Sequence, residues 1–322
     1  MAQIKQDAFA EAGGFLRRHL EYNLPEVLTR RYSSLPFANG RYVRLMTDLP
    51  LGASSVIQET VDTYGDAAVT AGAATDVPLA HAGVGEDKYK VIQLSSAFQY
   101  SWNELLSAQQ ASRNGYHSGN LTNYRMYSAR RAIAEKLNQV VAYGSPGLDV
   151  PGFYSNSHVP QRNESTDFIN DSSVTAQEIA DFLISEADDI ADESQLTERP
   201  NVVLVPVALH TQLTTKSVSG TDTTIKEYVL KNSPYIEAIE PVTECKAGQL
   251  EQFGVTASGN GRDRVIFYPL NEEVVQGRIT EAQQLPETQH DQMFKVVLVQ
   301  FTAGCWFNYP KAARYVDIPT KS

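Results

Sequence analysis

The chain has 322 residues, of which 42% are hydrophobic and 20% charged, so it can bury a sizeable core in one large or two medium-sized domains. No apolar run approaches the roughly 20 residues of a membrane helix, and the N-terminus lacks the basic-then-apolar pattern of a secretory signal, so we expect neither a membrane segment nor export. The net charge of −11 argues against a dedicated nucleic-acid binder, because such proteins usually carry a basic surface.

The N-terminal stretch differs from the rest of the chain in charge. Up to residue 44 its net charge is +3, so the remainder carries −14. The basic residues of this stretch are Lys5, Arg17, Arg18, Arg30, Arg31, Arg41 and Arg44. They can pair with an acidic neighbouring subunit or approach phosphate, although a solvated helix face is the simpler interpretation. Residues 1–40 predict one or two helical segments without a sustained heptad pattern, and an extension of this kind often folds against a partner.

Residues 41–102 are rich in β-forming residues. Residues 42–46 and 55–61 predict strands, and residues 94–102 alternate apolar and polar side chains as a return strand would. Between these arms, residues 65–86 are mostly small. We therefore predict a long two-stranded arm with a loose tip, which is marginal alone and should rest on another surface. The alternative is an ordinary hairpin with a mobile surface loop.

A short helix over 103–113 should precede one long amphipathic helix from Leu121 to about Tyr143. Apolar residues recur along the long helix at steps of three and four, namely Met126, Ala129, Ile133, Leu137 and Val140. Gly144 follows where a left-handed cap is expected, and Pro146 prevents the helix from resuming.

From residue 173 the pattern becomes α/β. Capping boxes at Thr175 and Thr224 predict two helix starts, and the apolar run at 201–205 predicts a buried strand. Further strands are expected near 236–242 and 264–268, with a short helix at 209–214 and a polar loop at 217–223. These elements predict a compact domain with a central sheet flanked by helices.

The last part of the chain returns to β-structure. Residues 294–301 predict a strand, Gly304 a turn or bulge, and residues 305–307 the continuation of this strand or a partner for it. Residues 312–318 predict a short edge strand.

No pattern of catalytic or metal-binding residues stands out. The six histidines are scattered, and no GxSxG elbow occurs. Cys245 and Cys305 predict buried free thiols. The acidic group Asp188, Asp189, Asp192 and Glu193 is read as the solvent face of a helix in preference to a divalent-ion site. We therefore expect a protein that is not an enzyme and has no cofactor and no metal.

The runs RRAIAEKLNQVVAYG (130–144), PGFYSN (151–156) and FKVVLVQFTAGCWFNYPKAARYVDI (294–318) resemble the major capsid proteins of tailed bacteriophages, whose Hong Kong 97-like fold is shared with encapsulin shells. The resemblance implies an α+β chain with four parts. These are an N-terminal arm (1–40), a strand with an extended β-hairpin called the E-loop (41–102), a peripheral domain with the long "spine" helix (103–147 and 278–322), and an α/β axial domain (148–277). The terminal strands would return to the peripheral sheet.

The function implied by the resemblance is a shell subunit that self-assembles into pentamers and hexamers. These would form an icosahedral virion head around double-stranded DNA, without sequence-specific binding and without a membrane, and assembly would take place in the host cytoplasm. Portal and decoration proteins are implied partners. Only about forty residues precede the first strand, so a separate scaffolding protein, or none, is expected.

The candidate interface residues are charged or polar and lie in the arm, the hairpin, the long helix and the polar loop. They are Arg17, Arg18, Arg30, Arg31, Arg41, Arg44, Glu59, Asp62, Lys88, Lys90, Arg130, Arg131, Ser217 and Thr223. Lys88 and Lys90 are placed in a surface loop. Three alternatives stay open: an encapsulin-type compartment that holds cargo protein, a tail or decoration protein, and a soluble α/β enzyme.

Overall fold

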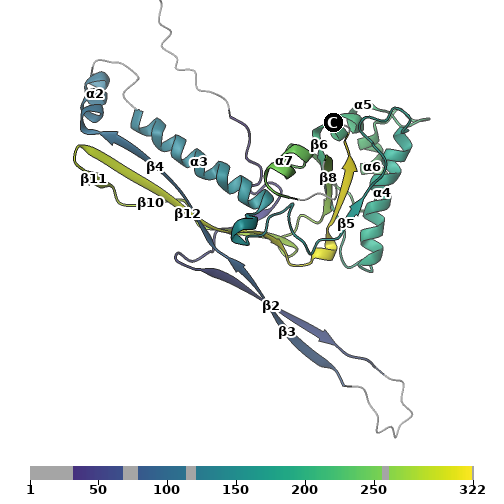
Figure 1. Ribbon diagram of the computed structural model, residues 1–322. Coiled ribbons are helices and arrows are strands. Elements are labelled where there is room, and N and C mark those ends of the chain that lie inside the picture. The colour runs from purple at the N-terminus through teal and green to yellow at the C-terminus, as the bar shows by residue number, and fades with distance from the viewer. Residues whose placement is uncertain (1–31, 68–78, 114–120, 256–260, 321–322) are drawn as a thin grey trace, which may run out of the picture.

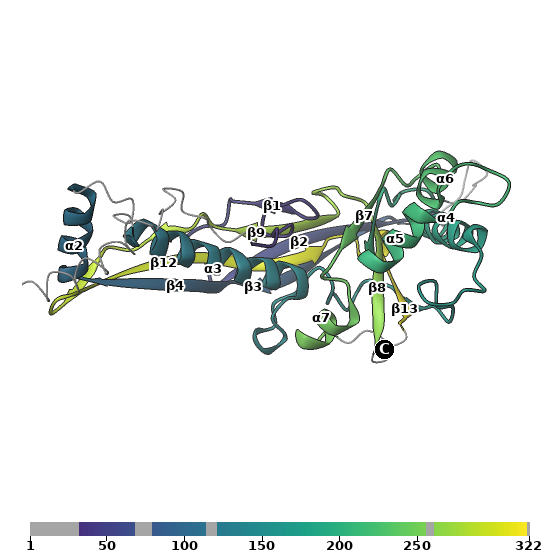
Figure 2. The same cartoon turned by 90° about the horizontal axis from the view of Figure 1, so that it is seen from above.

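A computed structural model describes residues 32–67, 79–113, 121–255 and 261–320 of the chain. The described part is elongated (Figures 1 and 2). A long helix on a sheet forms one end, a second sheet with several helices forms the other, and a β-hairpin projects from between them. No helix in the described ranges is long and apolar enough to cross a membrane.

The first sheet is built around β12 (Met293–Phe307). β4 (Ile92–Ser101) pairs antiparallel with one edge of β12, and β9 (Val275–Ile279) pairs with the other. The remaining strands of this sheet are β1 (Arg44–Met46), which is parallel to β9, and β10 (Gln283–Gln284) and β11 (Thr288–His290), which pair with β12.

One face of this sheet is covered by α3 (Leu121–Tyr143), the predicted long helix (Figure 1). Its apolar stripe packs on the sheet as expected, with Ala129, Ile133, Leu137 and Val140 buried. These residues share one hydrophobic cluster with sheet residues such as Leu298. The predicted short helix is α2 (Trp102–Arg113), which follows β4 directly.

The second sheet has the order β5–β13–β8–β6–β7. The strands are β5 (Gln161–Asn163), β13 (Arg314–Pro319), β8 (Arg262–Tyr268), β6 (Val202–Pro206) and β7 (Ala238–Val242). The helices are α4 (Ala176–Glu193), α5 (Val207–Thr215), α6 (Ile225–Asn232) and α7 (Ala247–Gln252), and both predicted capping boxes are present at α4 and α6.

This second sheet buries both of its faces. Val203 and Phe267 face α4, α5 and α6, whereas the alternate residues Leu204 and Tyr268 belong to the cluster that contains α3. Because successive residues of a strand point to opposite faces, the same strands contribute side chains to both hydrophobic clusters. The second sheet therefore connects the two ends of the molecule.

The junction between the two ends depends on close backbone contacts. Gly144 ends α3 with a φ of 74°, as predicted, and a Cβ on Gly152 would lie 2.1 Å from the Gly144 nitrogen. Gly304 has a φ of 77° at a register shift in β12, so of the two predicted features, a turn or a bulge, the structure shows a bulge. After it, the Cys305 amide donates to the Pro151 carbonyl at 3.1 Å. Between α3 and Gly152, residues Pro146–Leu148 form one 3₁₀ turn (η2).

The pairing predicted for the hairpin was wrong. β2 (Ser55–Tyr64) pairs antiparallel with β3 (His81–Lys90), a segment assigned largely to the loose tip, whereas the predicted return strand is β4 of the first sheet. β3 shows no apolar alternation because most of its side chains are exposed on both faces of the ribbon. Lys88 and Lys90 accordingly lie in a strand and not in a loop.

The predicted edge strand at 312–318 was also placed wrongly. Pro310–Ala312 form a 3₁₀ turn (η3), and β13 then lies inside the second sheet, between β5 and β8, and does not return to the first sheet. Residues Arg314 to Ile318 of β13 are all buried, because neighbouring strands cover both of its edges and packed side chains cover both of its faces. The predicted domain boundaries stay a prediction.

Candidate assembly surface

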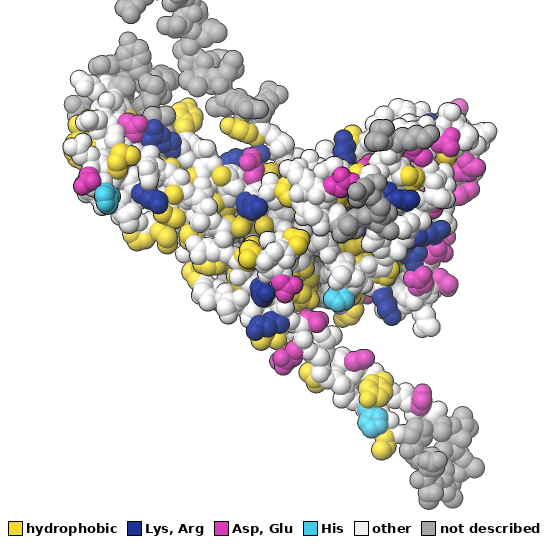
Figure 3. All heavy atoms as spheres, viewed as in Figure 1, with side chains coloured by type: hydrophobic (Ala, Val, Ile, Leu, Met, Phe, Trp, Pro, Cys, Tyr) yellow, Lys and Arg dark blue, Asp and Glu magenta, His cyan; other side chains and the backbone are white. Residues whose placement is uncertain are grey.

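The β2–β3 hairpin projects away from both sheets, and its side chains are mostly exposed (Figures 1 and 3). Ile57, Val61 and Val84 are exposed by 55%, 63% and 69%. Branched apolar side chains in water gain roughly 25 cal/mol for each Å² that a partner covers. The hairpin is therefore a surface that contact with another molecule would stabilise.

The base of the hairpin is fixed to the body. Tyr89 stacks on Trp306 of β12 with ring centroids 4.2 Å apart, and the Gln276 amide donates to Gln58 at 3.1 Å. Lys90 forms an ion pair with Asp149 at 3.5 Å, although both groups are largely exposed. Burial against the body raises the pKa of Tyr89 to about 12. These contacts set the direction of the hairpin and leave its outer part free.

The pairing register divides the hairpin side chains between two faces. Opposite residues of an antiparallel pair share a face, so Val56 and Tyr89 lie with Gln58 on the face that contacts the body. The other face carries the cross-strand pairs Ile57–Lys88, Glu59–Glu86 and Val61–Val84, and at its base Lys90, which pairs with Asp149.

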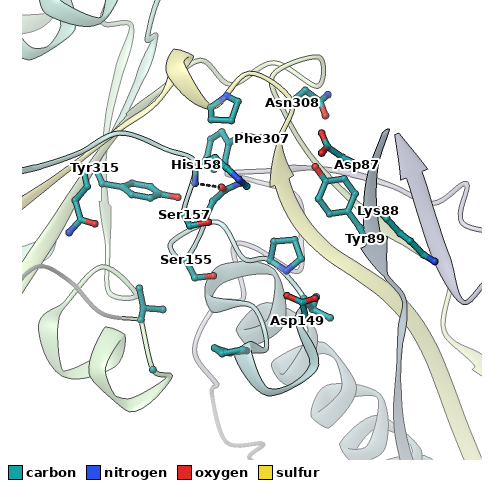
Figure 4. Close-up of a pocket in the computed structure, with 18 of the residues that line it drawn as sticks. Asp87, Lys88, Tyr89, Asp149, Ser155, Ser157, His158, Phe307, Asn308 and Tyr315 are labelled. Atoms are coloured by element: carbon teal, nitrogen blue, oxygen red, sulfur yellow. Dashed lines mark hydrogen bonds between the residues drawn. The ribbon is translucent and has the colours of Figure 1, made fainter. Parts of the chain in front are cut away.

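A groove of about 920 Å³ lies beside the hairpin base (Figure 4). It is lined by Tyr89 of β3, by the loop from Asp149 to His158, and by Asn308 and Tyr315. Its lining mixes carboxylate, ammonium, amide and hydroxyl groups. In the described ranges, no cluster of three or more His, Cys, Asp or Glu residues could hold a metal ion.

The structure brings together only some of the predicted interface residues. Glu59 and Asp62 lie on β2, Lys88 and Lys90 on β3, so these four share the hairpin. Arg17, Arg18, Arg30 and Arg31 lie outside the described residues.

The other predicted residues are dispersed over the body. Arg41 forms an ion pair with Glu240 of its own chain at 2.7 Å, and Arg44 is exposed on β1. Arg130 is exposed on α3, whereas Arg131 binds Glu135 and donates to the Ser33 carbonyl. Ser217 and Thr223 flank the loop between α5 and α6, where the Val218 amide donates to the Thr223 carbonyl at 3.1 Å.

Sequence reasoning missed the apolar residues of the hairpin and a second exposed patch at the far end of the first sheet. There Trp102, Leu106 and Met293 are exposed by 50%, 46% and 42%. The start of α2 is nevertheless well held, because Arg125 donates twice to Glu104 at 2.9 Å. The exposure of Trp102 at the start of α2 has no local sequence signal.

The acidic group on α4 is only partly a solvent face. Figure 3 shows acidic side chains gathered at that end of the molecule. Asp189 and Glu193, however, approach Arg314 at 3.7 and 2.7 Å, beside the buried Glu186. The predicted buried free thiols Cys245 and Cys305 are confirmed.

Comparison with known proteins gives a consistent result. A family model described as "Major capsid protein" matches residues 65–318. The capsid of Myoviridae phage XM1 is 16% identical, with a TM-score of 0.73 over 94% of this chain and 97% of that chain. The capsid of cyanophage P-SCSP1u is 14% identical, with a TM-score of 0.57 over 94% and 93%.

A virus-like particle from Pyrococcus furiosus has the same fold at 10% identity, with a TM-score of 0.51 over 88% of this chain and 95% of that chain. No curated protein matches the sequence.

Proposed function

The chain belongs to the major capsid protein family, and we propose that it assembles with copies of itself into pentamers and hexamers that close as an icosahedral head around double-stranded DNA. The site of this function is the set of surfaces that copies present to one another. The observation that carries the proposal is the hairpin, because it is firmly attached at its base and exposed along its length.

Contacts of this kind suit a closed shell. A projecting hairpin and the body that receives it are different surfaces, so the contact between two copies is heterologous. Repeated around an axis, heterologous contacts close into rings when the rotation permits. The second exposed patch, with Trp102 and Met293, offers a further contact at the opposite end of the first sheet.

The charge of the chain fits a container for DNA. With a net charge of −11, the subunit would release few counterions from DNA, so the packaged genome would not be held tightly by the wall. The basic residues near the N-terminus are candidates for the inner face or for contacts between subunits. Scaffolding, portal and decoration proteins are proposed as further partners, and the virion as the location of the assembled protein.

Electron microscopy with light scattering on the purified chain tests the proposal. Wild-type protein, with added scaffolding protein if the chain needs one, should form rings or closed shells of uniform diameter. A variant in which residues 60–85 are replaced by a two-residue turn keeps the attached hairpin base. It should remain a folded subunit that forms no shell. Shells of normal diameter from the shortened variant would contradict the role given to the hairpin.

An encapsulin-type compartment is the second candidate, and the fold shared with the Pyrococcus furiosus particle is the observation that favours it. The TM-score with the XM1 capsid is higher, 0.73 against 0.51. The contents of particles purified from the native source separate the two functions, because a phage head holds DNA and an encapsulin-type compartment holds protein. A stable monomer under all assembly conditions would instead favour the soluble enzyme.

A further inference from the structure

β4 is an edge strand of the first sheet. It pairs antiparallel with β12 along its whole length, from Ile92 to Ser101, and no second strand of the described ranges pairs with it. Figure 2 shows β4 along one margin of the sheet. A strand in this position presents a row of main-chain N–H and C=O groups that can pair with another chain.

The backbone hydrogen bonds show which residues of β4 turn these groups outwards. The Trp102 amide donates to the Gln292 carbonyl at 3.0 Å, directly after the opposed pair Ser101–Met293. Hydrogen-bonded and non-hydrogen-bonded pairs alternate along an antiparallel ladder, so the even-numbered residues of β4 bond to β12 and the odd-numbered ones face away from it. The outward row consists of Gln93, Ser95, Ala97 and Gln99.

The outward row is almost free of hydrogen bonds in the subunit. The Gln99 carbonyl accepts one from the Arg125 guanidinium at 2.6 Å. Among the described residues, no other hydrogen bond reaches the main-chain groups that the four residues turn outwards. Their side chains are exposed as well. Donors and acceptors on this edge are therefore available to a strand from outside the subunit.

The outward row carries none of the features by which natural edge strands avoid pairing. Such edges usually have charged side chains, a proline or a bulge. The segment from Gln93 to Gln99 has neither a charge nor a proline, and its register with β12 is regular. The edge strand β7 of the second sheet, by contrast, carries Glu240 and Pro241. The two edges therefore differ in a way that favours pairing at β4 alone.

We propose that the outward row of one subunit pairs with the outward row of a second copy, antiparallel and about a two-fold axis at Ser96. In this register Ser95 stands opposite Ala97 of the second copy, and Gln93 stands opposite Gln99. Every outward N–H and C=O group then has a main-chain partner, and no like charges face each other. A register shifted in either direction leaves one end of the row unpaired.

A second copy is the partner that this row fits. A nucleic acid or a charged peptide would find no counter-charge on the row, whereas a second copy brings donors and acceptors at the same spacing. The same register brings Trp102 to the Ile92 end of the second strand. The indole, 50% exposed in the subunit, is then partly covered.

This inference rests on the proposed shell function and names a contact that the function requires. The hairpin and the body that receives it are different surfaces, so their contact is heterologous and builds rings. Rings must also be joined to one another. A contact about a two-fold axis can join two rings, because each side presents the same surface. Edge pairing should therefore be needed for closed shells and not for single rings.

Disulfide formation tests the register directly. In the proposed pairing the two Ser96 residues face each other at a non-hydrogen-bonded position, where Cα atoms lie about 4.5 Å apart. Disulfides form at Cα separations of about 4.4–6.8 Å, so S96C shells should give covalent dimers under mild oxidation, measured on non-reducing gels. S128C places a thiol on the exposed face of α3, is the matched control, and should stay monomeric on the same gels. The native Cys245 and Cys305 are buried and should not react.

A proline substitution tests whether closure needs the free edge. The Ala97 N–H points away from β12, so A97P removes no hydrogen bond of the sheet but blocks the pairing edge. A97P should still form single rings, and its yield of closed shells should fall at least roughly tenfold, by electron microscopy and light scattering. A97S keeps the N–H and should assemble like wild type. Thermal unfolding shows whether A97P is folded.

The outcomes separate the two proposals. Failure of wild type to assemble, with or without scaffolding protein, would reject the shell function itself. Closed S96C shells without covalent dimers, or closed A97P shells at the wild-type yield, would overturn the edge pairing alone. If A97P does not fold, the S96C crosslink still decides.

Discussion

Arg264 and Asp317 form an ion pair with side chains only 2% and 0% exposed. Two hydrogen bonds of 2.8 and 3.0 Å join them, and Arg264 also donates to the Tyr154 carbonyl and lies over the Tyr315 ring. D317N leaves a buried guanidinium without its counter-charge, so we expect the subunit to lose about 3–5 kcal/mol of unfolding free energy. Denaturant unfolding of the subunit measures this loss.

The matched control is the ion pair of Arg41 with Glu240, where the Arg41 side chain is 61% exposed. Exposed pairs contribute little because water screens them, so E240Q should cost no more than ~1 kcal/mol. Equal losses of unfolding free energy in D317N and E240Q would show that burial does not determine how much these ion pairs stabilise the subunit.

Gly152 controls the close backbone contact between the end of α3 and the loop that follows it. A Cβ there would lie 2.1 Å from the Gly144 nitrogen and 2.3 Å from the Tyr143 carbonyl carbon, and backbone atoms cannot move aside. We expect G152A to destabilise the subunit by about 3 kcal/mol or more, at the upper end of overpacking. Thermal unfolding measures the effect. G147A, whose Cβ would meet no atom within 4 Å, should be close to wild type, and a wild-type G152A would refute the packing argument.

At the scale of elements, α2 is fixed at its start although its side chains are mostly exposed. Hydrogen bonds from Arg125, with help from the Ser101 amide, lower the pKa of Glu104 to about 2. A lowered pKa means that the contact is present at neutral pH and persists below the ordinary glutamate value. It is lost only as the pH falls towards 2.

We expect R125Q to raise the pKa of Glu104 towards the ordinary glutamate value, as measured by NMR titration of the carboxyl carbon. The same change should make the start of α2 exchange its amide hydrogens faster at neutral pH, because the helix buries little else. The control is R130Q, which removes an exposed arginine from α3, the helix that also carries Arg125, and should leave the Glu104 titration unchanged. An unchanged titration in R125Q would refute the assigned cause.

At the scale of the whole molecule, two hydrophobic clusters share the second sheet and join the ends into one body. The chain carries a net charge of −11. We expect the subunit to show no measurable binding to duplex DNA at micromolar concentration and ~0.15 M salt, by fluorescence anisotropy. A basic DNA-binding protein in the same buffer is the control. Tight binding with a steep salt dependence would contradict a passive container wall.

The hairpin shows how much of the candidate assembly surface local sequence patterns can predict. Glu59, Asp62, Lys88 and Lys90 were predicted as interface residues, and the structure places all four on the hairpin; their contact with another subunit stays a prediction. Glu86 and the apolar pair Val61–Val84 were missed. Their significance depends on which residues stand opposite, and a ribbon exposed on both faces has no apolar alternation from which to read its register.

The sequence by itself determined the elements whose causes are local. The long helix, its glycine end, both capping boxes and the Gly304 bulge follow from periodicity, side-chain caps and backbone conformation within a few residues. The resemblance in three short runs was enough to indicate the family, which the match over residues 65–318 confirms.

Only the tertiary structure decided which strands pair. β4 joins β12 across about two hundred residues, and β13 takes an interior position in the second sheet, between β5 and β8. The sequence of a strand indicates that the segment will join a sheet. Its partner strand depends on which arrangement of all the strands buries the most apolar surface. For the same reason the buried Arg264–Asp317 pair and the free face of the hairpin became visible only in the folded molecule.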